Sequence, residues 1–250
     1  MKFDKKKIVL LSSSLAGGGT EGVCVSIANS IADMGWQVDL VVLNLNDEVY
    51  LDRVSKNVNL VVLSVSHARF SSIPLLKYIY KNKPKIILVF NYELSVMLVI
   101  LRLILRLRIK IISRNMSTLS IRIKQFKQKN FWAKYVVGPL INYFYHKIDH
   151  VVNQCSGMQD DLIAVHPQLY QRSSIIYNPI ASHILDYVSM HDLNKINKKN
   201  YLLCVGRLEE VKAYHYAIEG FAGIVDRFPN LRLKIVGQGS LERELKQKTM

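Results

Sequence analysis

The chain has 250 residues, of which 50% are apolar and 21% are charged, so it is long enough for one or two globular domains and is not intrinsically disordered. Its formal net charge of +15 indicates an anionic partner, such as a nucleic acid, an anionic membrane surface or a phosphorylated substrate. The cysteines, Cys24, Cys155 and Cys204, lie too far apart for a disulfide framework or a metal site, which indicates a reducing cytoplasm.

The chain begins with a repeating strand-helix pattern. Residues 8–14 form an apolar run typical of a buried strand, and a glycine loop follows at 17–22. Residues 23–34 carry apolar side chains at helical spacing, and residues 38–43 form a second apolar strand. Strands and helices with short connections predict an α/β fold with a parallel sheet that is covered on both faces.

This alternation continues to about residue 177. The further predicted strands are 58–63, 85–90, 109–113, 150–153 and 173–177, and the further predicted helices are 73–81, 92–107, 131–145 and 158–164. The most apolar stretch, Leu94–Ile112, contains Arg102, Arg106, Arg108 and Lys110, which would be costly inside a bilayer. It is therefore interpreted as a core helix with its arginines on the outer face, followed by a strand.

A change of composition divides the chain. Residues 181–200 are polar and weakly periodic, which predicts a linker between an N-terminal domain at 1–180 and a second domain at 201–250. The second domain restarts the pattern with strands at 201–205 and 231–236 and helices at 214–228 and 241–248. Fifty residues are too few to cover both faces of such a sheet, so this domain is expected to be incomplete.

Three glycines of the first loop, Gly17, Gly19 and Gly22, match the spacing of a dinucleotide-binding turn before a helix. The match is imperfect because no acidic residue ends the second strand. Three interpretations stay open: a nicotinamide-dependent oxidoreductase, a tight turn without a ligand, and a loop that contacts phosphate or sugar. The third is favoured.

The segment 122–145 combines basic and aromatic side chains. It could bind single-stranded nucleic acid, which is the least favoured alternative, or lie on an anionic membrane surface. It could also be a solvated cationic face above core aromatics. The histidines share no spacing, so no metal site is expected, and no nucleophile motif is present.

A second candidate site follows the strand at 201–205. Gly206 and Arg207 come directly after this strand, and Lys212 precedes the next predicted helix. Two cations at a strand-to-helix turn favour a doubly anionic ligand such as a diphosphate, although an ordinary surface pair is the plain alternative.

Four stretches resemble glycosyltransferase family 4, the group 1 retaining glycosyltransferases of the GT-B architecture with two Rossmann-like domains. They are the Gly-Gly-x-Glu type loop at 18–23, the serine-start helix at 155–162, the Asn-Pro segment at 176–180, and the Gly-Arg…Lys turn at 205–212 with Gly237 in the stretch 235–240. In this order they span nearly the whole chain.

The resemblance implies a nucleotide-sugar donor, of the UDP-sugar type, bound between the two domains without a metal or another cofactor. It implies catalytic roles for Arg207 and Lys212, which would stabilise the departing diphosphate. The donor-binding residues would be Gly18, Gly19, Gly206 and Gly237, and the acceptor-binding residues would be Glu21, Arg114 and Asn115.

The resemblance also implies a lipid-linked or polysaccharide acceptor, a retaining reaction, and a role in lipopolysaccharide or capsule synthesis on the cytoplasmic face of the membrane. Two departures matter. The family's Glu-x7-Glu motif would lie beyond Met250, so a truncated or fragmentary enzyme is expected. The family's Gln-Lys-Gly is Val211-Lys212-Ala213 here. The competing hypothesis is an inactive chain that acts only as a membrane-surface binding module.

Overall fold

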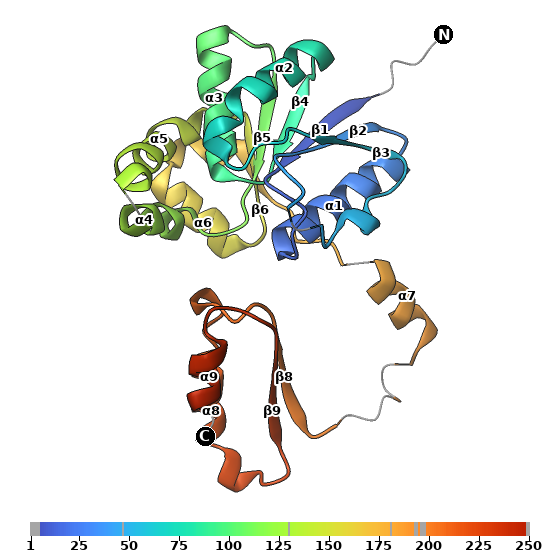
Figure 1. Cartoon of the computed structure of the whole chain (residues 1–250), viewed down its shortest axis with the longest axis vertical. Coiled ribbons are helices and arrows are strands. Elements are labelled where there is room, and N and C mark those ends of the chain that lie inside the picture. The colour runs from blue at the N-terminus through green and yellow to red at the C-terminus, as the bar shows by residue number, and fades with distance from the viewer. Residues whose placement is uncertain are drawn as a thin grey trace. The chain divides into compact units, whose positions relative to one another are not determined.

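The chain forms two compact units, Met1–Ser182 and His183–Met250, in a computed structural model that describes residues 6–46, 48–129, 131–180, 182–192, 195 and 199–248 (Figure 1). The stretch predicted as a linker, 181–200, includes helix α7 (Ser182–Met190). Its residues 181, 193, 194 and 196–198 lie outside the described residues. The role of this stretch as a linker stays a prediction.

Seven strands of the first unit form one parallel sheet in the order β3-β2-β1-β4-β5-β6-β7. They are β1 (Lys7–Ser12), β2 (Gln37–Val42), β3 (Val58–Val62), β4 (Ile86–Val89), β5 (Lys110–Arg114), β6 (His150–Asn153) and β7 (Ser173–Ile175). The strand order reverses between β1 and β4, which is the switch point where doubly wound sheets bind ligands. The predicted α/β fold with a parallel sheet is confirmed.

Helices cover both faces of this sheet (Figure 1). Val9 and Leu11 of β1 point to one face and Leu10 points to the other, so each face has its own core. Helix α1 (Gly19–Asp33) covers the Leu10 face. The opposite face is covered by α2 (Ser72–Asn82), α3 (Tyr92–Leu105), α4 (Leu119–Lys129), α5 (Gly138–Phe144) and α6 (Ser156–Val165).

The single helix predicted over 131–145 is wrong in detail. A π-helical turn at Ala133–Val137 precedes α5, and a short 3-10 turn at Tyr145–Lys147 follows it. Pro139 explains the break, because its nitrogen cannot donate the backbone hydrogen bond that a continuous α-helix would need there.

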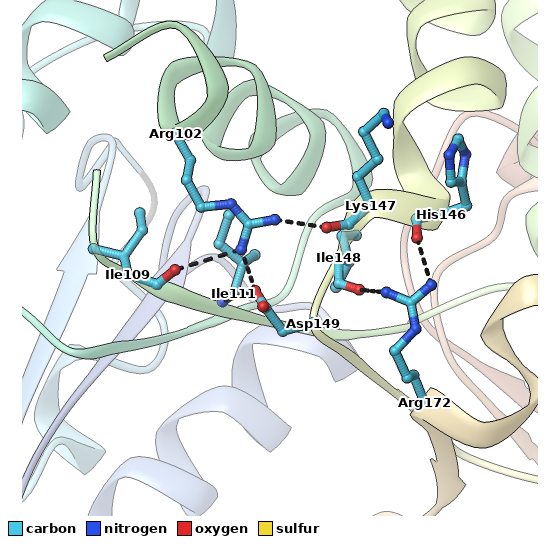
Figure 2. Close-up of polar contacts among 8 residues, drawn as sticks. All are labelled: Arg102, Ile109, Ile111, His146, Lys147, Ile148, Asp149 and Arg172. Carbon is cyan, nitrogen blue, oxygen red and sulfur yellow. Dashed lines mark hydrogen bonds and ion pairs between the residues drawn. The ribbon is translucent and has the colours of Figure 1, made fainter. Parts of the chain in front are cut away.

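Two arginines fix the turn that leads into β6 (Figure 2). Arg102 of α3 donates to the Lys147 carbonyl over 2.6 Å and pairs with the Asp149 carboxylate, and Arg172 donates to the carbonyls of His146 and Ile148, each over 3.0 Å. The Arg102 side chain is only 17% exposed, so its predicted place on the outer face of the helix is wrong.

The apolar stretch 94–112 forms α3 and β5, as predicted. In the described part of the chain, no helix has both the length and the apolar character that a bilayer crossing requires.

The second unit contains a parallel pair of strands, β8 (Tyr201–Val205) and β9 (Arg232–Val236), with helices α8 (Tyr214–Ala222) and α9 (Glu242–Lys248). Its small core is built from Leu208, Tyr214, Ile218 and Leu245. The helices cover one face, while Leu203, Val205 and Val236 remain more than half exposed.

Candidate functional site

The carboxyl ends of β1 and β4 meet at the switch point of the first sheet, and a side-chain hydrogen bond joins them. Asn91 follows β4 and donates from Nδ2 to the Ser13 hydroxyl over 3.0 Å. Its Oδ1 accepts from the Leu94 nitrogen over 3.1 Å and so caps α3. Asn91 therefore links the loop after β1 to the loop after β4.

The glycine loop opens α1 at this same edge of the sheet. Gly18 is the N-cap of α1, and no side chain caps the helix, so its first backbone N–H groups have no intrahelical acceptor. Glu21 lies in the first turn, where its charge suits the helix dipole. A Cβ on Gly18 would overlap the Glu21 carboxylate, whereas a Cβ on Gly19 would have no atom within 4 Å. Gly19 thus borders open space at a helix N-terminus.

Arg114 ends β5 and is 3% exposed. Its Nη2 donates to the carbonyls of Ile176 and Tyr177 over 2.9 and 3.2 Å and to Asn178 Oδ1 over 3.1 Å. Its buried Nε has no partner among the described residues, and burial lowers the pKa of the guanidinium. The side chain therefore ties the segment after β7 to the sheet edge.

Asn115 is 2% exposed and joins the same network. Its Nδ2 donates to Asn153 over 2.7 Å, its Oδ1 accepts from the Tyr145 hydroxyl, and its backbone carbonyl accepts from Gln154 over 2.8 Å. Gln154 in turn accepts from Asn178 over 2.9 Å. The predicted acceptor contact of Arg114 and Asn115 stays a prediction, and both side chains have little free surface.

The site residues predicted from the sequence did not include Tyr145, Asn153, Gln154 or Asn178. Asn153 and Gln154 follow the end of β6, just as Arg114 and Asn115 lie at the end of β5. Polar residues at the ends of neighbouring parallel strands were thus the available signal.

In the second unit, the turn after β8 is closed by backbone contacts with the turn after β9. Gly206 donates to the Val236 carbonyl over 3.0 Å, and Leu208 donates to the Gln238 carbonyl over 2.9 Å. A Cβ on Gly237 would overlap the Gly206 carbonyl, so only glycine permits this approach. The structure thus brings Gly206 and Gly237 together.

Two exposed cations project from this closed turn. Within the described residues, the side chains of Arg207 and Lys212 have no hydrogen-bond or ion-pair partner. The Lys212 stem lies beside Gly206, because a Cβ on that glycine would be 3.6 Å from Lys212 Cε. The acidic neighbour Glu209 instead accepts from the Ser240 hydroxyl over 3.0 Å. The arrangement offers positive charge on a rigid turn.

Ala213 occupies the position where the resemblance leads one to expect glycine. Its φ of 52° and ψ of 36° are left-handed, and it is the N-cap of α8. The turn geometry that glycine favours is therefore kept, at a steric cost of about 1 kcal/mol for the methyl group.

No metal ligand set occurs in the described part of the chain, where no three His, Cys, Asp or Glu side chains are grouped to hold an ion. The expectation of metal-independent chemistry stays a prediction.

Comparisons with known proteins match nearly the whole chain. The family described as Glycosyltransferase Family 4 matches residues 17–182, and the family described as Glycosyl transferases group 1 matches residues 189–249. An uncharacterized glycosyltransferase of Methanocaldococcus jannaschii is 24% identical over 181 residues, which are 69% of this chain and 44% of that protein.

Solved structures share the fold. The lipopolysaccharide outer core galactosyltransferase WaaB has a TM-score of 0.61 and 18% identity, over 97% of this chain and 64% of that one. Anabaena HepE in complex with UDP and glucose has a TM-score of 0.67 and 17% identity, over 97% and 65%. This chain therefore spans less than two thirds of the length of these relatives.

Proposed function

The chain belongs to Glycosyltransferase Family 4, and on this premise we propose that it transfers a hexose from a nucleotide-sugar donor with retention at the anomeric carbon. We propose a UDP-sugar as the donor, because HepE has been solved with UDP and with UDP-glucose. The proposed acceptor is a lipid-linked saccharide or a growing cell-surface polysaccharide, and the similarity to a lipopolysaccharide galactosyltransferase supports it.

The observation that carries the proposal is the pair of unpartnered cations, Arg207 and Lys212, on the closed turn after β8. Breaking the bond between the sugar and the nucleotide leaves negative charge on the departing diphosphate. Cations that are already in place stabilise that charge without reorganising, which is the usual large term in such catalysis. In this scheme the two side chains do what a bound metal ion does elsewhere, and no cofactor takes part.

We assign the first unit to donor and acceptor positioning. Gly18 and Gly19 let the α1 N-terminus approach the donor phosphates, whose charge suits free N–H groups and the helix dipole. Glu21 is the proposed contact to an acceptor hydroxyl. Arg114 can reach an acceptor only if the Asn178 segment shifts, because its side chain donates to Asn178. The Asn115 side chain can do so only if its bonds to Asn153 and Tyr145 break.

Calorimetry with UDP and with GDP on the full chain tests this assignment. We expect binding that weakens about tenfold or more when Arg207→Ala and Lys212→Ala are combined, since each cation makes charge-assisted contacts. Arg227→Ala with Arg232→Ala is the matched control, because it also removes two exposed cations from the second unit. A chain that binds neither nucleotide would refute the proposal, and equal loss in both double variants would refute the roles of Arg207 and Lys212.

We further propose that the first unit lies on an anionic membrane surface through the segment 122–145. The interpretation as core aromatics fails for Phe131, Trp132, Tyr135 and Tyr143, which are 51–77% exposed. Lys124, Lys127 and Lys134 lie in the same segment and are exposed. Exposed aromatic rings beside lysines suit the headgroup region of an anionic bilayer.

Vesicle sedimentation tests the membrane proposal. Phe131→Ala with Trp132→Ala should lower partitioning onto vesicles with anionic lipid about tenfold, because two exposed rings no longer enter the interface. Phe70→Ala with Tyr170→Ala removes two other exposed rings of the same unit and should leave partitioning unchanged. Equal partitioning of all three proteins would refute this surface.

The competing function is a membrane-surface binding module without catalysis. The same exposed aromatic segment favours it. It predicts vesicle binding together with no measurable affinity for UDP or GDP, so the two experiments above separate it from the transferase.

A further inference from the structure

The amino ends of the central strands gather a group of cations. Parallel pairing places the starts of β2, β1 and β4 side by side, with Lys7 opposite Gln37. Lys6 precedes β1 and Lys7 begins it, Trp36 precedes β2, and Lys83 and Lys85 precede β4. This edge is opposite to the edge that carries the glycine loop.

These side chains line one cavity of about 310 Å³. The Lys6 ammonium lies 5.4 Å from the centre of the Trp36 ring, which forms an aromatic wall. Four lysines around one hollow concentrate positive potential, because a concave low-dielectric surface focuses the field of its charges.

One carboxylate among the described residues contacts these lysines, and its oxygens already accept hydrogen bonds from other side chains. Asp39 pairs with Lys7 at 2.9 Å and also accepts from Asn59 over 2.9 Å and from the Tyr78 hydroxyl. Lys6, Lys83 and Lys85 have no ion-pair partner within the described part of the chain. Three of the four positive charges are therefore available to a ligand.

Lys83 adopts a strained backbone. It caps the end of α2 with φ of 45° and ψ of 53°, a left-handed conformation that glycine or asparagine adopts more easily. A left-handed residue directly after a helix is common, and Arg106 has the same conformation after α3. Here this conformation places a lysine, and not a glycine, at the rim of the cavity.

We propose that this cavity is a second anion-binding site that takes a group with two or more phosphate charges, such as pyrophosphate or a phosphorylated lipid headgroup. The site lies in the first unit and uses none of the residues assigned to sugar transfer. It goes beyond the proposed function and does not depend on it.

Trp36 provides a local readout. The chain contains two tryptophans, Trp36 and Trp132, so Trp132→Phe leaves one emitter, which lies in the cavity wall. Titrating this variant with inorganic pyrophosphate should change its fluorescence in a saturable way. Adding Lys83→Gln and Lys85→Gln should raise the half-saturation concentration about tenfold, because two charge-assisted contacts are lost.

Two controls separate this site from others. Lys56→Gln with Lys77→Gln removes two exposed lysines that do not line the cavity and should leave the response unchanged. Arg207→Ala with Lys212→Ala should also leave it unchanged, so this site can fail or succeed independently of the diphosphate turn. No saturable response, or an equal response in the Lys83→Gln and Lys85→Gln variant, would overturn the proposal.

Titrations with lipid vesicles distinguish a lipid headgroup from a free phosphate compound as the occupant of this site. Vesicles of phosphatidylcholine with phosphatidic acid should change Trp36 emission, and pure phosphatidylcholine should not, if the occupant is a lipid headgroup. A response to pyrophosphate without a response to either vesicle assigns the site to a free phosphate compound.

Discussion

The variant Gly19→Ala tests whether Gly19 is needed for ligand binding or only for the structure of α1. Gly19 is the first residue of α1, and no atom lies within 4 Å of the place where its Cβ would be. The neighbouring glycines differ, because a Cβ on Gly18 would meet Glu21 and a Cβ on Gly22 would lie 3.1 Å from the Tyr50 ring. The added methyl group at position 19 therefore enters space that the unliganded protein leaves empty.

The substitution is expected to change stability only slightly and ligand affinity strongly. Replacing glycine by alanine within a helix stabilises by up to about 1 kcal/mol, and at the first helical position we expect about 0.5 kcal/mol or less. A ligand phosphate that approaches the α1 N-terminus would meet the methyl group. We expect the affinity for UDP-glucose to fall about tenfold or more, since close backbone contact is then blocked.

The assay pairs urea unfolding with calorimetry on the same protein. Gly220→Ala in α8 is the matched control, because its Cβ would also have no atom within 4 Å. We expect both variants to unfold at or above the wild-type midpoint and only Gly19→Ala to lose affinity. Unchanged binding by Gly19→Ala at unchanged stability would show that the donor does not approach this residue.

Three further predictions concern stability. Arg102→Met should destabilise the first unit by about 2 kcal/mol, because a partly buried ion pair to Asp149 and carbonyl contacts are lost, whereas exposed Arg108→Met should change urea unfolding little. Ala213→Gly should stabilise the second unit by about 0.5 kcal/mol by relieving the left-handed alanine, and a fall in its thermal midpoint would contradict this. Burial, and then the neighbouring His146, lower the pKa of His166, so its contribution is full above about pH 6.5 and is lost as pH falls below it. His166→Phe should therefore flatten the loss of stability as the pH falls below about 6.5, and an unchanged slope would refute this.

Much of the sheet was predictable because its signals are local. The strand over 150–153 and the strand over 201–205 match β6 and β8, since each is a short apolar or strand-type run bounded by turn residues. The interpretation of 181–200 as a linker missed helix α7, because the apolar residues of Ser182–Met190 were taken together with the polar residues at 191–200.

The site was predictable in position but not in detail. Arg114 and Asn115 do lie at the carboxyl end of a strand, where ligands bind in such folds. Arg114 bonds to Ile176 and Asn178, more than sixty residues away in the chain. Asn115 bonds to Tyr145 and Asn153, which are 30 and 38 residues away, so the sequence could not reveal that these side chains are buried and bonded. Likewise, only the fold shows that Lys6 and Lys85 line the same cavity.

The parallel pair β8 and β9 has a consequence for the behaviour of the protein in solution. Each strand has one strand neighbour among the described residues, so each presents an unsatisfied ladder of backbone donors and acceptors along its outer side. Leu203 and Val205 add exposed apolar side chains to this ladder. The amides of the second unit should therefore exchange with deuterium long before those of β1 and β4, through openings that leave the first unit intact.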